Sequence, residues 1–260
     1  MRIAVIGAGI SGLVTAYLLS ESHDIVVYEA NDYIGGHTNT IDVENDEGHF
    51  AVDTGFIVFN DRTYPNFIAL MDELKVPSQP TRMSFSVSCE KTGLEYRGAD
   101  FSGLFAQRRN LFNPRFLKLL LDLVRFNKAG EKLLENEQEN ETVEEFFKRN
   151  QFSTQFIEQY FLPMGAAIWS ASFDTFKNFP IRFIAEFYQN HGLLGVTNRP
   201  QWRVITGGSR QYIAPLTQDW SEHIHTKQPV QGVQRTEDEV TILTKDGKTH
   251  AFDHVVFACH

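Results

Sequence analysis

Three glycines near the amino terminus have the spacing of a phosphate-binding turn. They form a G-x-G-x-x-G pattern in the run Gly7-Ala8-Gly9-Ile10-Ser11-Gly12. In such a turn the first glycine permits a tight bend, the second lets the backbone approach a pyrophosphate, and the third lets a helix pack closely on a strand. The amino end of that helix then favours the anion. The pattern predicts that residues 7–12 bind the diphosphate of a dinucleotide.

An acidic residue follows at the position that suits the ribose of the same dinucleotide. Glu29 comes directly after a second apolar run, residues 25–28. A carboxylate at the end of this strand can accept hydrogen bonds from both ribose hydroxyls, and its charge disfavours the 2′-phosphate of NADP. Glu29 is therefore predicted to bind ribose.

The hydrophobic pattern predicts the elements that position these residues. Residues 3–6 and 25–28 are continuously apolar, and residues 13–19 between them have helical spacing. Strands that are apolar on both faces belong to a parallel sheet that is covered on both sides. We therefore predict a strand–helix–strand unit, followed by short strands over 40–43 and 50–52.

The strand pattern changes near residue 62 and returns after residue 200. The later part contains extended segments over 202–205 and 229–233, a helix over 212–220, a hairpin of 240–244 with 249–252 across Asp246-Gly247, and a buried strand over 255–259. The predicted fold class is α/β. A Rossmann-like dinucleotide-binding domain (FAD/NAD(P)-binding in type) is formed by 1–61 and 201–260, and an α+β domain, expected to bind the substrate, is inserted over 62–200.

The inserted segment is predicted to be mainly helical. Its expected elements are a helix over 65–74, strands over 83–88 and 94–97, a long helical stretch over 101–130, and a helix that starts with a capping box at Thr142-Val143-Glu144-Glu145. The stretch 101–130 contains six basic side chains and one acidic side chain.

The composition excludes several classes of protein. With 260 residues, 42% of them hydrophobic and 22% charged, the chain is globular and not disordered. A net charge of -9 argues against binding to duplex nucleic acid. Two cysteines, Cys89 and Cys259, are too few for a disulfide framework or a thiolate metal site, so a reducing cytoplasmic setting is predicted.

The residues after Glu29 resemble a known family. The run Glu29-Ala30-Asn31-Asp32-Tyr33-Ile34-Gly35-Gly36-His37-Thr38 resembles the second fingerprint of glutathione-reductase-type flavoproteins, within them the amine oxidase and phytoene desaturase superfamily. The resemblance implies FAD as the cofactor, with the paired glycines beside its diphosphate. That family usually has an arginine after the glycine pair, where this chain has His37.

Two later segments extend the resemblance to FAD. Val52-Asp53-Thr54-Gly55-Phe56-Ile57 is similar to the segment that passes under the flavin ring, with Gly55 leaving room for the ring. Thr206-Gly207-Gly208-Ser209 followed by Pro229-Val230 is similar to the family's return to the FAD domain. Val230 matches the residue whose backbone contacts the adenine.

The resemblance is closer to one subgroup, the amine-oxidase-like proteins found with, or fused to, cyclopropane fatty acid synthases. It runs over essentially the whole chain and is carried by Met83-Ser84-Phe85-Ser86-Val87-Ser88, Ser102-Gly103-Leu104-Phe105-Ala106-Gln107, Ala166-Ala167-Ile168-Trp169-Ser170, Asn190-His191-Gly192-Leu193-Leu194 and Arg199-Pro200-Gln201-Trp202. Such relatives continue to a third FAD segment, so the chain is expected to be a fragment that lacks its C-terminal part.

These observations predict an FAD-dependent oxidoreductase that transfers a hydride from its substrate to the flavin. The substrate is expected to be a small molecule or a lipid, with an acyl chain favoured and an amine as the alternative. Two other classes remain open: a non-catalytic protein that binds a lipid or a partner on the same fold, and an NAD-dependent dehydrogenase. No catalytic acid or base, metal site or oligomeric state is assigned.

Three further features have an ordinary structural explanation as well as a functional one. His223 and His225 have a spacing that could hold a metal ion, but an exposed strand edge is the favoured interpretation. His191 is a candidate base or a structural hydrogen-bonding residue. The basic, apolar stretch 111–126 would suit a peripheral contact with an anionic membrane, but a substrate-domain helix with a solvated basic face is favoured.

Overall fold

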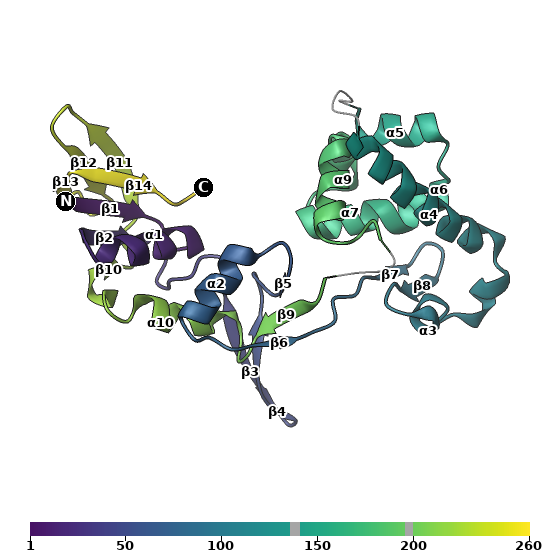
Figure 1. Cartoon of the computed structure of the whole chain (residues 1–260), viewed down its shortest axis with the longest axis horizontal. Coiled ribbons are helices and arrows are strands. Elements are labelled where there is room, and N and C mark those ends of the chain that lie inside the picture. The colour runs from purple at the N-terminus through teal and green to yellow at the C-terminus, as the bar shows by residue number, and fades with distance from the viewer. Residues whose placement is uncertain (136–140, 196–199) are drawn as a thin grey trace. The chain divides into compact units, whose positions relative to one another are not determined.

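The computed structural model describes residues 1–135, 141–195 and 200–260, which form two compact units (Figure 1). Unit 1 combines residues 1–81 and 202–260, and unit 2 contains residues 82–201. The chain thus leaves unit 1 once and returns to it once, as the discontinuous domain predicted from the sequence requires.

Unit 1 is built around parallel and antiparallel strands. Its elements are β1 (Arg2–Ile6), α1 (Ile10–Ser20), β2 (Asp24–Tyr28), β3 (Thr40–Asn45), β4 (Gly48–Asp53), β5 (Phe59–Asn60), α2 (Pro65–Glu73), β6 (Ser78–Pro80), β9 (Trp202–Ile205), a 3-10 helix (Ser209–Tyr212), α10 (Ile213–Thr217), a 3-10 helix (Ser221–His223), β10 (Ile224–His225), β11 (Val230–Arg235), β12 (Val240–Thr244), β13 (Thr249–Phe252) and β14 (His254–Phe257).

A four-stranded parallel sheet forms the centre of unit 1. Its strand order is β10-β2-β1-β14, and Ile3 of β1 is opposite Ile25 of β2 and His254 of β14. Val5 and Val27 pack with α1 on one face of the sheet, and Ala4 and Val26 pack on the other face with side chains of β12 and β13. Both faces are therefore covered, which explains why β1 and β2 are continuously apolar.

Smaller sheets complete unit 1. β11, β12 and β13 form an antiparallel sheet, and the predicted hairpin of β12 and β13 turns at Asp246-Gly247. β3 pairs with β4, and β9 lies between β5 and β6.

The boundary between the units differs from the sequence prediction. Residues 62–81, expected in the insertion, belong to unit 1. Two contacts explain this: Met71 of α2 is buried in the core of unit 1, and β6 pairs with β9 through Gln79 and Val204. The predicted helix over 212–220 is shorter than expected, since α10 ends at Thr217.

Unit 2 is mainly helical, with one antiparallel pair of strands. Its elements are β7 (Ser86–Cys89), β8 (Leu94–Arg97), α3 (Phe101–Leu104), a 3-10 helix (Arg108–Phe112), α4 (Pro114–Glu135), α5 (Val143–Asn150), α6 (Thr154–Phe156), a π-helix (Ile157–Phe161), α7 (Leu162–Trp169), α8 (Phe173–Phe176) and α9 (Ile181–Asn190). Among the described residues, no helix is both long enough and apolar enough to cross a membrane.

Aromatic side chains dominate the core of unit 2. Phe126 of α4 lies 5.0 Å from Phe161 between ring centroids, and Phe147 of α5 lies 4.6 Å from the same ring. Trp169 and Tyr188 extend the cluster towards α7 and α9. Edge-to-face and tilted pairs of this kind add to the stabilisation from burial of apolar area.

The predicted helical stretch 101–130 is interrupted. α4 begins only at Pro114, where a missing amide hydrogen costs nothing because the first helical amides have no intrahelical acceptor. The Asn113 side chain accepts hydrogen bonds from the backbone amides of Arg115 and Phe116 at 3.1 and 3.4 Å. The predicted capping box of α5 is confirmed, because Thr142 and Glu145 bond reciprocally.

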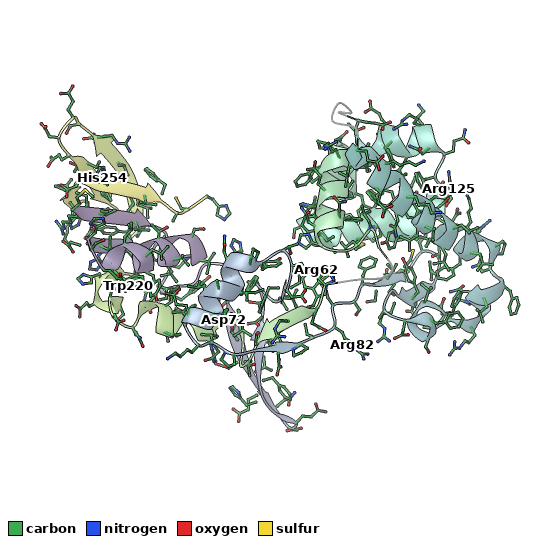
Figure 2. All side chains as sticks on the ribbon, in the orientation of Figure 1. Arg62, Asp72, Arg82, Arg125, Trp220 and His254 are labelled. Carbon is green, nitrogen blue, oxygen red and sulfur yellow. The ribbon has the colours of Figure 1, made fainter. Side chains whose placement is uncertain are left out.

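A buried carboxylate joins α4 to the start of α6. Asp122 is completely buried, and its carboxylate accepts hydrogen bonds from the Ser153 backbone amide at 3.0 Å, from Lys118 Nζ at 3.1 Å and from the guanidinium of Arg125. Figure 2 labels Arg125 on unit 2. Burial alone would raise the pKa of Asp122, but these hydrogen bonds outweigh it and lower the pKa to about 2. The group is therefore ionised throughout the neutral range.

We expect Asp122→Asn to lower the free energy of unfolding at pH 7 by about 2 kcal/mol, the usual size of a lost charged hydrogen bond. Because the folded pKa lies below the unfolded value of about 4, the carboxylate stabilises the fold above pH 4 and loses this effect as the pH falls towards 2. Urea unfolding at pH 7 and pH 3 measures the difference.

Asp174→Asn is the matched control, because Asp174 pairs with Lys177 at 3.1 Å but its side chain is 93% exposed. That variant should change the stability by less than about 0.5 kcal/mol. Equal effects of the two substitutions, or an Asp122 effect that is the same at both pH values, would contradict the structural role of Asp122.

Candidate cofactor site

The predicted site residues lie at the carboxyl ends of the parallel strands. The Gly7 amide donates to the Tyr28 carbonyl at 2.8 Å, and the Ala258 amide donates to the Ile6 carbonyl at 2.8 Å. The ends of β1, β2 and β14 are therefore joined directly. In open parallel sheets, ligands bind outside these ends, where the strand order reverses. β1 is such a point, since β2 and β14 lie on opposite sides of it.

The glycine turn brings α1 against the end of β1. A Cβ atom on Gly12 would lie 1.9 Å from the Gly7 carbonyl oxygen, so only glycine fits there. α1 follows Gly9 without a side-chain cap, and Ile10 and Ser11 in its first turn are exposed. The first amides of a helix have no intrahelical acceptor. This turn therefore offers backbone donors to an anion.

Glu29 is held by two backbone amides. Its side chain is largely buried, and its Oε2 and Oε1 accept hydrogen bonds from the amides of Ala8 and Asn31, both at 2.8 Å. A carboxylate can accept about four hydrogen bonds, so acceptor positions are left for two ribose hydroxyls. The next residue, Ala30, is exposed.

The paired glycines lie against the first glycine turn. The Gly35 amide donates to the Ala8 carbonyl at 2.8 Å, and Gly9 and Gly35 form a parallel bridge. Gly36 has a φ of +60°, and a Cβ atom there would lie 2.9 Å from the Cα of Gly9. Any side chain at Gly36 would separate the two segments, because a contact under 3.0 Å is not tolerated by backbone atoms.

The residues after the glycine pair connect it to the segment predicted under the flavin. His37 is exposed, and its carbonyl accepts from the Phe56 amide at 2.8 Å. Gly55 and Ile57 on either side of Phe56 are exposed. Residues 55–57 therefore lie beside residue 37, as one continuous cofactor surface would require.

Thr38 is buried and linked to the α10 region. Its hydroxyl bonds to the hydroxyl of Tyr212. Burial raises the pKa of Tyr212, an effect that the bond to Thr38 partly opposes, so the phenol is protonated at neutral pH.

The segment before Val230 lies alongside Glu29. The Gln228 amide donates to the Glu29 carbonyl at 2.9 Å, and the Lys227 amide donates to the Asn31 carbonyl at 2.8 Å. Val230 itself is partly buried and packs with side chains of the central sheet. The structure thus brings all the predicted segments together in unit 1, and binding of FAD by the individual residues stays a prediction.

Asp53 is a site residue that sequence analysis did not single out. Its carboxylate accepts from the Ser209 amide at 2.8 and 3.1 Å, from the Ser209 hydroxyl at 2.8 Å and from the Thr40 hydroxyl at 2.6 Å. These hydrogen bonds hold Ser209, directly after the Gly207-Gly208 turn, against the end of β4 just before Gly55. The motif drew attention to the glycines alone, and no local pattern links residues 53 and 209.

Among the histidines named as weaker candidates, His225 lies next to Glu29, whose backbone amide donates to the His225 carbonyl at 2.9 Å. No group of three or more metal-ligating side chains is found among the described residues. The Nε2 atom of His223 lies 3.6 Å from Oε1 of Glu222, and the His225 ring packs beside the Tyr28 ring. His191, in unit 2, stacks on Phe187 with ring centroids 3.8 Å apart.

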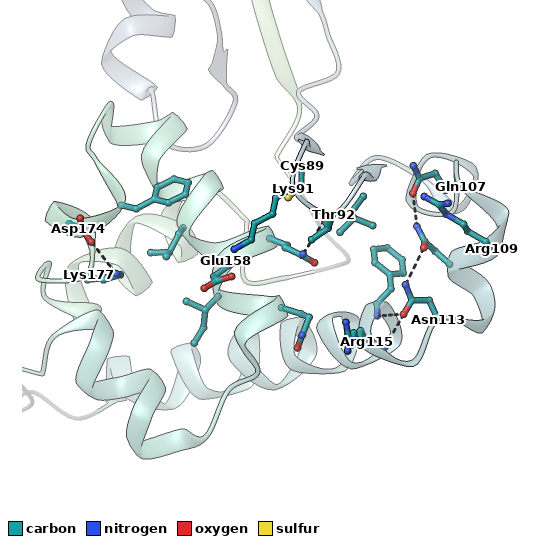
Figure 3. Close-up of a pocket in the computed structure, with 18 residues that line it drawn as sticks. Cys89, Lys91, Thr92, Gln107, Arg109, Asn113, Arg115, Glu158, Asp174 and Lys177 are labelled. Atoms are coloured by element: carbon teal, nitrogen blue, oxygen red, sulfur yellow. Dashed lines mark hydrogen bonds and ion pairs between the residues drawn. The ribbon is translucent and has the colours of Figure 1, made fainter.

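Unit 2 contains a cavity of about 850 Å³ between its strand pair and its helices (Figure 3). The lining combines four cationic side chains with apolar ones, namely Lys91, Arg109, Arg115 and Lys177 with Leu94, Phe116, Ile157, Leu162 and Phe173. Lys177 pairs with Asp174 at 3.1 Å, and Glu158 is the other acidic residue of the lining. Cationic side chains therefore outnumber acidic ones around this cavity.

A family model described as flavin containing amine oxidoreductase matches residues 10–260. The chain belongs to this family. The family resemblance seen in the sequence is thereby confirmed, and so is FAD as the family's cofactor. The association with cyclopropane fatty acid synthases stays a prediction.

Two sequence relatives and one solved structure illustrate the relationship. The chain is 30% identical over 115 residues to a probable zeta-carotene desaturase of Synechococcus elongatus, which is 41% of this chain and 23% of that protein. It is 38% identical over 77 residues to a 15-cis-phytoene desaturase of the same organism, 29% of this chain and 15% of that protein.

The fold is similar to that of a cyclohexylamine oxidase from Brevibacterium oxydans, with a TM-score of 0.70 and 20% identity. The similarity covers 99% of this chain and 57% of that one, so the chain spans less than two thirds of the length of that oxidase. It confirms the expected fold, an FAD-binding domain with an inserted second domain.

We expect Glu29→Gln to weaken FAD binding about tenfold or more, since an amide has one acceptor oxygen and turns a donor towards a backbone amide. Fluorescence titration with FAD measures the change. Asp24→Asn, at the exposed start of the same strand, is the matched control and should bind FAD as the wild type does. Equal affinities of Glu29→Gln and the wild type would exclude Glu29 from the site.

Asp53→Asn is expected to destabilise unit 1 by about 1–3 kcal/mol through the unsatisfied Ser209 donors. It should also reduce the rise in melting temperature that saturating FAD produces, because the strand end before Gly55 is no longer fixed. Differential scanning fluorimetry with and without FAD separates the two effects. Asp46→Asn, in the exposed turn between β3 and β4, serves as the control. An unchanged FAD-induced shift in Asp53→Asn would limit Asp53 to a role in folding.

Proposed function

We propose that the protein is an FAD-dependent oxidoreductase that removes a hydride from a C–H bond of an apolar substrate, with a lipid acyl chain as the substrate class. The observation that carries this proposal is the contact between the two glycine segments beside Glu29. Gly36 lies against Gly9, and the Glu29 carboxylate accepts a hydrogen bond from the amide of Ala8, the residue before Gly9.

This arrangement supports FAD over NAD as the bound dinucleotide. An NAD-binding strand–helix–strand unit needs the glycine turn and the acidic residue, but it gives no role to Gly35, Gly36 and the segment 55–57. In this chain the Gly35 amide donates to the Ala8 carbonyl, and the Phe56 amide donates to the His37 carbonyl.

The sequence relatives favour an apolar hydrocarbon over an amine. The two relatives at 30% and 38% identity are named as desaturases of zeta-carotene and phytoene. The cyclohexylamine oxidase is only 20% identical, which supports the fold and not the substrate.

The cavity in unit 2 supports the same choice. Lys91, Arg109 and Arg115 would repel a protonated amine but attract a carboxylate or phosphate. The apolar part of the lining, with Leu94 and Phe116, suits a hydrocarbon chain. A single-chain lipid with an anionic head group fits both properties.

FAD and the protein have different roles in the proposed reaction. Bound FAD supplies the electron-accepting chemistry, and desaturation of an acyl chain also requires loss of a proton from the neighbouring carbon. The residues of unit 1 hold and orient the dinucleotide. The residues of the cavity in unit 2 bind the substrate and exclude water.

Anaerobic reduction tests the proposal. The chain is loaded with FAD and mixed without oxygen with palmitate, oleate, putrescine or cyclohexylamine, while the visible flavin band is followed. We expect a fatty acid to bleach the band and both amines to leave it unchanged. Arg115→Gln should raise the fatty acid concentration needed for half-maximal bleaching, and Arg235→Gln, at an exposed position of β11, should not.

Bleaching by an amine alone would overturn the substrate class and leave the oxidoreductase intact. A chain that holds FAD but is reduced by none of the four compounds would contradict the proposed acyl substrate. A folded chain that binds no FAD would overturn the proposal as a whole.

A further inference from the structure

Helix α4 has apolar side chains on two opposite faces. Phe116, Leu119 and Phe126 are 2%, 1% and 1% exposed and face the core of unit 2. Leu117 and Leu121 lie on the opposite side with 39% and 62% of their surface exposed. An amphipathic helix of a soluble domain normally has one apolar face, so α4 has a second one without a partner.

The exposed side chains form a continuous row. Leu117, Leu121 and Val124 are spaced by four and three residues, which places them on one helical face. Val124 is 50% exposed, and Phe112, just before the helix, is 88% exposed. Single exposed apolar residues are common on protein surfaces, but a row over successive turns marks an interaction surface. We call Leu117, Leu121 and Val124 the outer row, and Phe112 belongs to the 3-10 helix before α4.

The surface around the outer row is positively charged. The only acidic residue of the stretch 101–130 is Asp122, and it is completely buried. Lys118 and Arg125 bond to it but remain 47% and 46% exposed. Lys128, four residues after Val124, has no carboxylate partner within the described part of the chain. Exposed cationic side chains thus outnumber exposed acidic ones over residues 114–130 of a chain whose net charge is -9, and Glu131 and Glu135 follow at the C-terminal end of α4.

We propose that the outer row of α4 rests on an anionic membrane surface. Its aliphatic side chains enter the boundary between head groups and acyl chains, and the basic side chains beside them contact anionic head groups. A fluid lipid surface accepts a convex apolar row without a complementary groove. A second copy of the chain would bring two basic surfaces together, and their repulsion disfavours self-association through this face.

The proposal goes beyond the proposed function, because it involves neither FAD nor the cavity of unit 2. It also differs from the sequence-based preference for a solvated basic face. Periodicity identified α4 as amphipathic, but only the packing of unit 2 shows which apolar residues are left outside the core.

Co-flotation with vesicles tests the proposal. The full chain is mixed with vesicles of phosphatidylcholine, or of phosphatidylcholine with phosphatidylglycerol. We expect binding to the anionic vesicles only, and release as the salt concentration rises, since salt screens exposed charges. The double variant Leu121→Gln, Val124→Gln should lower the partition constant about tenfold or more. Glutamine retains a good helix propensity, so α4 should persist.

Two further variants separate the apolar contribution to vesicle binding from the electrostatic one. Leu18→Gln removes an apolar side chain that is 65% exposed on α1, and it should bind vesicles as the wild type does. Lys128→Gln should weaken binding to anionic vesicles and reduce its salt dependence. Circular dichroism of each variant shows whether the helices are intact.

Three results would overturn the proposal. The first is a wild-type chain that does not float with anionic vesicles. The second is a row variant that is folded and binds them as tightly as the wild type. The third is a dimer that the row substitutions convert to a monomer without any change in vesicle binding, which would assign the outer row to self-association.

Discussion

The structure of unit 1 depends on the close approach of two glycine segments across the end of a parallel sheet. A Cβ atom on Gly36 would lie 2.9 Å from the Cα of Gly9, and one on Gly12 would lie 1.9 Å from the Gly7 carbonyl oxygen. With any larger residue the chain could not place α1, the strand end at Glu29 and the segment after Gly36 around one point. Glu29 completes the arrangement, because its carboxylate is fixed by the amides of Ala8 and Asn31 and not by another side chain. Backbone geometry, more than any catalytic side chain, therefore defines this site.

The features that depend on local sequence were predictable. The strand–helix–strand unit follows from apolar runs and glycine spacing, and the hairpin over Asp246-Gly247 and the capping box at Thr142 follow from short-range turn and helix chemistry. Pairings between distant segments were not predictable. β6 joins β9 through Gln79 and Val204, and this contact places residues 62–81 in unit 1. The bonds from Ser209 to Asp53 cross 156 positions, and no motif signals them.

Unit 2 shows how a buried charge and an aromatic core act together. The Phe126 and Phe161 rings supply apolar contact area, and Asp122 fixes α4 relative to Ser153 at the start of α6. One buried acid, Asp122, is paired with two cations, Lys118 and Arg125, whose side chains remain 47% and 46% exposed. The sequence contained these residues, but their separation into a buried and an exposed set is a property of the packing.

The central claim is that unit 1 holds FAD, and the visible absorption spectrum of the purified chain tests it most directly. The spectrum is recorded before and after denaturation and filtration, and again after incubation of the folded chain with added FAD. The account predicts a flavin spectrum on the protein and release of FAD on denaturation. A colourless, folded monomer that leaves added FAD in the filtrate would contradict it.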